Sequence, residues 1–201
     1  MKKESTRSPT LINRRRKISC YKFNLLELLS TKIDFFQQLL KGWRTTVYKT
    51  EIELAEISQK DKVLFIGSGF FPYAATLIAE ETKAKVISID NDEKTIKSAK
   101  AYIEKNGLSH LITIEYGDGL TYPVQDFDVI FIAINVWPID QVLEHIHSQM
   151  KTDARVLCKC FRNDIATILE LDNLSGKFLV KSVLQNPKSH SYLLLKNNPN
   201  K

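Results

Sequence analysis

The sequence of 201 residues contains little cysteine, glycine or proline, with three, seven and six residues of these types. So few glycines and prolines exclude a collagen-like or low-complexity chain, and the 43% hydrophobic content is that of one globular domain. The cysteines are odd in number, and Cys158 and Cys160 are one residue apart in a strand-like stretch, where a mutual disulfide would be strained. We therefore expect a reducing compartment, the cytoplasm.

Apolar runs of about 18–20 residues, the length that a membrane-spanning helix needs, are also absent. The basic amino terminus is followed by Lys22, Asn24 and Glu27 instead of the apolar segment of a signal peptide. The sequence thus predicts a soluble protein without a membrane span.

Positive charge is concentrated at one end of the chain. Residues 1–22 hold eight Lys or Arg and one acid, a formal charge of +7, whereas the rest of the chain is near −1. We interpret residues 1–22 as a flexible basic arm. It could bind RNA phosphates or an anionic membrane through Arg14-Arg15-Arg16-Lys17, or it could be only a solvated tail.

Residues 23–60 read as a helical extension. Apolar residues recur every three or four positions from Leu25 to Leu40, and a second helix is expected from about Thr45 to Ser58. The apolar face of this extension could pack on its own sheet or on a second copy of the chain, so a homodimer is one alternative.

From residue 61 to residue 197, short β-branched runs alternate with helical segments, as in a three-layer α/β domain with a mainly parallel sheet. We count five βα units and then two strands with no helix between them, which predicts seven strands ending in an antiparallel hairpin. The expected strands are Val63–Ile66, Val86–Ile89, Ile112–Glu115, Phe127–Ile134, Arg155–Cys160, Phe178–Leu184 and Ser191–Leu195.

The strongest local signal is a strand that runs into a glycine turn and then a helix, with Gly67 and Gly69 on either side of Ser68. Glycines at this place let a ligand approach the backbone at the carboxyl edge of a parallel sheet. The next strand ends in Asp90, whose carboxylate could bind both hydroxyls of a ribose or could cap the helix that starts near Asp92.

Pro72 argues against a dinucleotide at this turn. A dinucleotide fingerprint has its third glycine there, and a pyrophosphate needs free amide groups at the helix start, which proline does not supply. An NAD-binding oxidoreductase is therefore disfavoured.

The stretch from Lys62 to Cys160 resembles the cofactor domain of class I S-adenosylmethionine-dependent methyltransferases. The resemblance rests on the glycine turn, on Asp90, and on Gly117-Asp118-Gly119 after the third strand. It implies a Rossmann-like methyltransferase fold that binds S-adenosylmethionine. The cofactor-binding residues that it implies are Gly67, Ser68, Gly69, Asp90, Asn91, Asp118, Gly119 and Asn135.

In detail, the resemblance implies that the glycines border the amino-acid part of the cofactor, Asp90 holds the ribose, and Asp118 approaches the adenine amino group. Asn135 would then lie near the methionine part and the acceptor. The sequence assigns no catalytic residue.

The string Ile66-Gly-Ser-Gly-Phe-Phe-Pro72 is also similar to the nicotianamine synthase group, which uses the same cofactor but transfers its aminocarboxypropyl chain. We therefore expect an S-adenosylmethionine-dependent transferase, most simply a methyltransferase with a small-molecule acceptor. Aminocarboxypropyl transfer is the alternative within this chemistry, and a non-catalytic RNA-binding protein that uses the basic arm is an alternative of another class.

Other conspicuous side chains have ordinary interpretations. Trp137 could line the acceptor site, but packing on the next helix is favoured, and Tyr48 is expected to be half-buried in its helix. The histidines lack metal-ligand spacing, so no metal site is expected.

Overall fold

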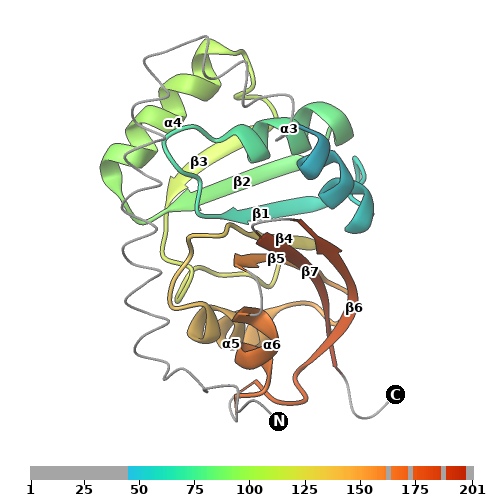
Figure 1. Cartoon of the computed structure of the whole chain (residues 1–201). Coiled ribbons are helices and arrows are strands. Elements are labelled where there is room, and N and C mark those ends of the chain that lie inside the picture. Colours follow the sequence, from blue (N-terminus) through green and yellow to red (C-terminus); the bar gives the residue numbers. More distant parts are fainter. Residues whose placement is uncertain (1–44, 162–163, 172–173, 187–188, 198–201) are drawn as a thin grey trace.

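The computed structural model describes residues 45–161, 164–171, 174–186 and 189–197. Their seven strands form one twisted sheet in the order β3-β2-β1-β4-β5-β7-β6, with helices on both faces (Figure 1). The strands are β1 Lys62–Ile66, β2 Lys85–Asp90, β3 Ile112–Tyr116, β4 Val129–Ile132, β5 Arg155–Phe161, β6 Phe178–Gln185 and β7 Ser189–Lys196. The helices are α3 Tyr73–Thr82, α4 Glu93–Lys105, α5 Ile139–Gln149 and α6 Asp164–Leu169, preceded by helical residues 45–54.

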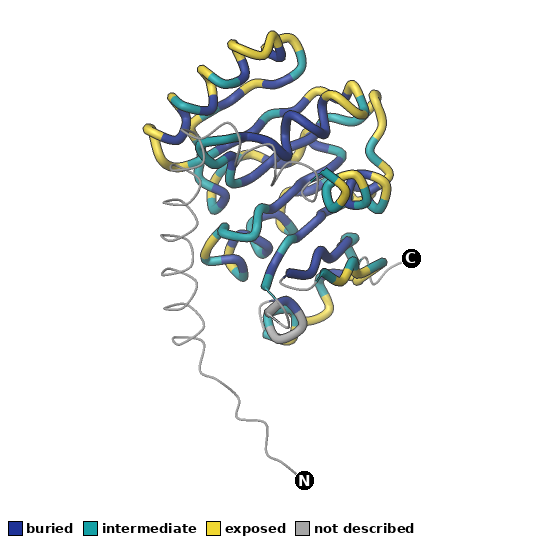
Figure 2. Tube along the Cα trace, turned by 45° about the horizontal axis from the view of Figure 1, so that its top comes forward, coloured by how far each residue is buried: buried dark blue, intermediate teal, exposed yellow. Residues whose placement is uncertain are grey.

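Strands β1 to β5 are parallel to one another, and β7 runs antiparallel to both of its neighbours, β5 and β6. The predicted three-layer α/β fold with an antiparallel terminal hairpin is therefore confirmed. The central strands are buried on both faces because helices cover both, and Figure 2 shows the buried interior surrounded by exposed helix surfaces.

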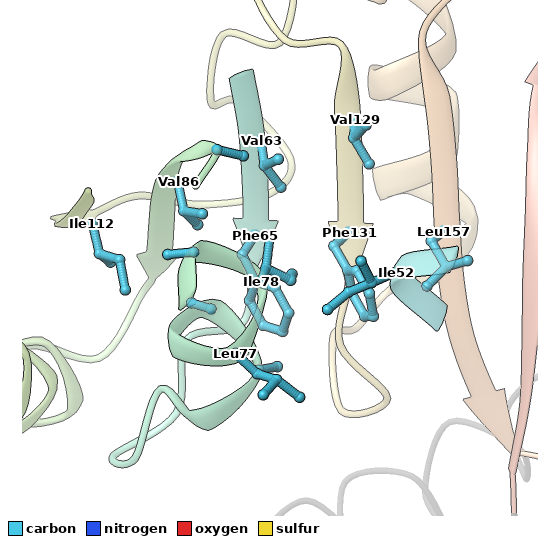
Figure 3. Packing of buried hydrophobic residues seen from close by; sticks show 14 of the residues in the cluster. Ile52, Val63, Phe65, Leu77, Ile78, Val86, Ile112, Val129, Phe131 and Leu157 are labelled. Atoms are coloured by element: carbon cyan, nitrogen blue, oxygen red, sulfur yellow. The ribbon is translucent and has the colours of Figure 1, made fainter. Parts of the chain in front are cut away.

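Alternate side chains of the central strands β1, β2, β4 and β5 contribute to two separate clusters. One face carries Val63, Phe65, Phe131 and Leu157, and it packs against helical residues 45–54, α3 and α4. Figure 3 shows Ile52 in this cluster beside Phe131 and Leu157. The other face packs against α5 and α6.

The helical residues 45–54 run antiparallel to β5. At the start of β5, the Arg155 guanidinium donates hydrogen bonds to the carbonyls of Ala55 and Glu56, each 2.7 Å long, and pairs with Asp61. Near the end of β5, Lys159 contacts Glu51. The first residues of the helix therefore lie toward the carboxyl ends of the parallel strands.

Two details of the predicted pattern are wrong. The expected strand Phe127–Ile134 is shorter, Val129–Ile132. Before it, the Asp128 carboxylate accepts a hydrogen bond of 2.8 Å from the Lys62 amide, and after it a turn begins at Ala133. The count of five βα units is also too high, since residues 117–128, between β3 and β4, form turns instead of a helix.

The predicted helix from Thr45 to Ser58 ends at residue 54 and continues into a turn at residues 55–56. The basic arm, residues 1–22, and residues 23–44 of the helical extension lie outside the described residues, as does the expected helix around Leu25 to Leu40. Within the described part of the chain, no helix is both long and apolar enough to cross a membrane.

Candidate functional site

Four loops meet at the carboxyl edge of the parallel strands. They follow β1, β2, β3 and β4, and together with Asp90, the last residue of β2, they carry every residue that the sequence singled out for cofactor binding. Parallel strands present their carboxyl ends at one edge, so this convergence is a direct consequence of the topology.

The loop after β1 is held in a conformation that requires glycine. Gly67 and Gly69 have φ angles of +91° and +68°, in the left-handed region. The amides of Gly67 and Ser68 both donate to the Ile89 carbonyl at 2.9 Å, which ties the loop to the end of β2. A Cβ on Gly67 would lie 2.9 Å from Val136 Cγ2, so the loop after β4 packs directly against the glycine loop.

Asp90 connects the glycine loop to the start of α4. Its carboxylate accepts hydrogen bonds from the amides of Gly69, at 3.0 Å, and Asp92, at 3.2 Å. Burial raises the pKa of Asp90, and these backbone hydrogen bonds partly oppose the rise.

The alternative role of Asp90 as the cap of α4 is wrong. That role belongs to Asp92, whose carboxylate accepts hydrogen bonds from the amides of Lys94 and Thr95. The Asp90 carboxylate instead faces the glycine loop, where it accepts the hydrogen bond from the Gly69 amide.

The loop after β3 is fixed to the same centre. The Gly117 amide donates to the Asp90 carbonyl at 3.0 Å, and the Asp118 carboxylate accepts from the Leu120 amide at 2.9 Å. Gly119 is buried, and a Cβ there would lie 2.9 Å from Ile66 Cγ2. These contacts bring Asp118 and Gly119 close to the ends of β1 and β2.

Tyr122 supports this loop, a role that the sequence did not indicate. Its ring would be 2.7 Å from a Cβ on Gly117, and its hydroxyl donates to Glu115 at 2.7 Å. Burial and the hydrogen bond to Glu115 raise the pKa of Tyr122, so its phenol stays protonated and keeps the bond. Glycine spacing alone gives no signal for a side chain that packs beneath the turn.

Asn91 and Asn135 lie at the same edge. Asn91 is exposed beside Asp90, and Asn135 is half-buried in the turn after β4. Trp137, in the same segment after β4, is 47% exposed.

The expectations for cysteine and histidine can be compared directly with the structure. Cys158 and Cys160 are buried in the cluster beside α5 and α6, as expected. His145 bonds to the Tyr122 carbonyl, whereas His147 packs on Phe178, so their rings serve separate contacts. Among the described residues, no group of three or more His, Cys, Asp or Glu side chains could hold a metal ion.

The edge has the features that a nucleoside cofactor with an amino-acid tail requires. Gly67 and Gly69 let the loop after β1 adopt left-handed φ angles, the Asp90 carboxylate lies beside that loop as a hydrogen-bond acceptor, and the Ser68 hydroxyl is buried without a hydrogen-bond partner. The residues present therefore fit S-adenosylmethionine.

Comparison with known proteins agrees with this geometry. Residues 57–192 match the model of a family described as a methyltransferase domain. A probable cobalt-precorrin-6B C(15)-methyltransferase from Thermoplasma volcanium is 26% identical over 122 residues, which cover 57% of this chain and 61% of that protein. The ribosomal protein L11 methyltransferase of Syntrophomonas wolfei is 33% identical over 70 residues. These residues cover 35% of this chain and 22% of that protein.

Solved structures share the fold. A mutant of the nicotianamine synthase MtNAS in complex with S-adenosylmethionine superposes with a TM-score of 0.74 at 18% identity, covering 94% of this chain and 77% of that one. An RNA methyltransferase from Salinibacter ruber in complex with S-adenosyl-L-homocysteine superposes with a TM-score of 0.62 at 16% identity. The superposition covers 78% of this chain and 95% of that one.

The chain spans about 61% and 22% of the lengths of the two relatives matched by sequence. The match to the family model, in contrast, runs from the segment before β1 into β7, and it therefore includes helices on both faces of the sheet. Because this match covers more than half of the chain, the chain belongs to the methyltransferase-domain family, and S-adenosylmethionine is the cofactor that this membership supports.

Proposed function

We propose that the protein transfers the methyl group of S-adenosylmethionine to a small-molecule acceptor bound over the carboxyl ends of β4 and β5. The observation that carries the proposal is the hydrogen bond of Asp90 to Gly69, together with the packing of Val136 against Gly67. These contacts join the ribose-binding position, the glycine loop and the loop after β4 in one site.

Each residue has a defined task in this proposal. The ionised Asp90 accepts hydrogen bonds from both ribose hydroxyls, while its bond to Gly69 keeps the glycine loop in place. The loop of Gly67 and Gly69 gives the amino-acid tail access to backbone amides, with the Ser68 hydroxyl as a further partner. Asp118 and Gly119 border the adenine, and Asn91 and Asn135 complete the site.

When bound, S-adenosylmethionine supplies an electrophilic methyl carbon on a sulfonium sulfur. The chain contributes mainly position: the fixed loops hold the acceptor in line with that carbon, which can account for much of the acceleration. A general base is needed only for an acceptor that loses a proton.

Aminocarboxypropyl transfer is the second candidate. It is favoured by the superposition on MtNAS over 94% of the chain, which includes more than the central sheet. Both reactions would use the same site and would differ in which carbon of the cofactor faces the acceptor.

RNA is a further class of acceptor, because the basic arm could bind its phosphates. A non-catalytic RNA-binding protein is disfavoured, because the chain belongs to a methyltransferase family.

Product analysis tests the proposal. The purified protein is incubated with S-adenosylmethionine and fractionated cell metabolites, with the Asp90→Ala variant as the control for contaminating enzymes. We expect S-adenosylhomocysteine to accumulate with the wild type only. Methylthioadenosine as the sole product would replace methyl transfer by aminocarboxypropyl transfer. Product formed with purified RNA but not with metabolites would overturn the small-molecule acceptor.

A further inference from the structure

A buried ion pair lies on the sheet face that carries helical residues 45–54. The Lys159 ammonium of β5 is 2.7 Å from Glu51 Oε1, with the Lys159 side chain 12% exposed and the Glu51 side chain 0% exposed. The Ser191 hydroxyl of β7 donates to the same Glu51 oxygen at 2.5 Å. Because Lys159 and Ser191 are opposite each other in the β5–β7 register, Glu51 is anchored to two strands at once.

The anchoring of Glu51 depends on few contacts. Its other carboxylate oxygen, Oε2, is buried and has no hydrogen-bond partner. A buried carboxylate is costly unless it is paired, so Lys159 is the main compensation for its charge. Loss of Lys159 would leave Ser191 alone to hold Glu51.

From Glu51, contacts lead along the helix to the carboxyl edge of the sheet. One turn earlier, the Tyr48 ring lies 4.3 Å from Lys159 Nζ and 6.2 Å, between ring centroids, from Tyr73. Another turn earlier, the hydroxyls of Thr45 and Tyr73 form a hydrogen bond of 2.5 Å. Residues three positions apart are neighbours on the surface of a helix, so Thr45, Tyr48 and Glu51 form a continuous row of side chains.

Tyr73 is the residue through which these contacts reach the cofactor site. It is the first residue of α3, four positions after Gly69, and its amide donates to the Phe71 carbonyl at 2.7 Å. Its ring stacks on the Phe71 ring at an interplanar angle of 9°. Movement of Tyr73 would therefore be transmitted to the segment that follows the glycine loop.

We propose that Glu51 and Lys159 are positioning residues for the cofactor site: their ion pair fixes the helix, and Thr45 and Tyr48 then hold Tyr73 and the glycine loop. This inference rests on the proposed binding of S-adenosylmethionine at that loop. It concerns cofactor affinity, so its test needs no knowledge of the acceptor.

The experiment measures S-adenosylmethionine binding to the full chain by calorimetry. Lys159→Met removes the ammonium and keeps most of the aliphatic stem, and we expect its affinity to fall by about fivefold or more. Lys159→Arg keeps the charge and should restore affinity to within about twofold of wild type. The matched control is Glu56→Gln, which removes the exposed ion pair with Lys181 in the turn after the same helix and should leave affinity unchanged.

A second variant covers the case in which Lys159→Met does not fold. Combining Glu51→Leu with Lys159→Met leaves no unpaired buried charge, so the domain is expected to stay folded while the directional contact is lost. Circular dichroism confirms folding at the temperature of the titration.

The outcomes separate the two proposals. A wild type that does not bind S-adenosylmethionine would overturn the proposed function, and the inference that rests on it. A wild type that binds, with folded Lys159→Met or the double variant binding equally well, would overturn the positioning role alone. Equal losses in Lys159→Met and Lys159→Arg would also overturn it, since the charge would then not matter.

Discussion

Replacing Asp90 by alanine tests the centre of the site. The carboxylate is half-buried, and hydrogen bonds to a charged group contribute about 1.5–3 kcal/mol each. For two ribose hydroxyls at a partly solvated carboxylate, we expect a loss of about 3 kcal/mol, or an S-adenosylmethionine Kd that is about 100-fold weaker. The Gly69 and Asp92 amides lose their acceptor, but a buried charge is removed as well, so stability should change by only ~1 kcal/mol.

Asp92 provides the matched control, because it is an acid two positions away with a different task. Asp92→Ala removes the cap of α4 and should destabilise the protein by about 1 kcal/mol without changing affinity. Calorimetric titration and thermal denaturation of both variants give the two quantities. A Kd for Asp90→Ala within threefold of wild type, or an equal loss in Asp92→Ala, would refute the assignment of Asp90 to the ribose.

The pH dependence gives a second view of the same residue. Burial raises the pKa of Asp90 above its ordinary value of 3.8. The wild-type affinity should therefore fall as the pH drops through this raised pKa, whereas the weak affinity of Asp90→Ala should be flat in that range. Parallel pH profiles of the two proteins would show that the Asp90 carboxylate is not the group that binds.

Two further changes test the framework around the site. Gly67→Ala places a Cβ on a residue with a φ angle of +91°, at 2.9 Å from Val136 Cγ2. We expect it to lower the stability by about 2 kcal/mol and to weaken cofactor binding. Unchanged thermal denaturation would contradict the loop geometry. Burial opposes ionisation of Asp128, but hydrogen bonds from Lys151 and the Lys62 amide outweigh it and lower the pKa. The stabilisation from Asp128 is then present above its ordinary pKa of 3.8 and is lost as the pH falls through the lowered pKa. Asp128→Asn should accordingly be ~1 kcal/mol less stable than wild type at pH 7, and the gap should close in acid; a gap independent of pH would refute the ionic contribution.

The strands and helices could be predicted because their signals are local. Runs of β-branched residues with helices between them are typical of a parallel sheet buried on both faces, and this pattern located all seven strands. The ends of β4 were less predictable, since Phe127 and Ile134 continue the apolar pattern outside the strand. The ends of β4 are set by the hydrogen bond of the Asp128 side chain and by the turn at Ala133, and neither can be recognised from the hydrophobic pattern.

The glycine turn and Asp90 could be recognised from the sequence as candidate site residues, but the contacts around them could not. Asp90 and Asp92 are two acids within three residues, and only the backbone at the end of β2 determines which one caps α4. The ion pair of Glu51 with Lys159 joins residues 108 positions apart, and no local pattern links them. Such contacts depend on where helical residues 45–54 cross the sheet, which is a tertiary property.

The direction of that helix explains how a segment before β1 reaches the carboxyl edge of the sheet. Its contacts with β5 run in opposite order: the start of β5, at Arg155, meets residues 55–56, while Lys159, near the end of β5, meets Glu51. Thr45 therefore lies at the carboxyl edge, where it bonds to Tyr73. A helix parallel to β5 would place Thr45 near the amino ends of the strands and leave Tyr73 without this hydrogen bond. The antiparallel crossing thus makes one helix both a cover for the apolar face and a support for the start of α3.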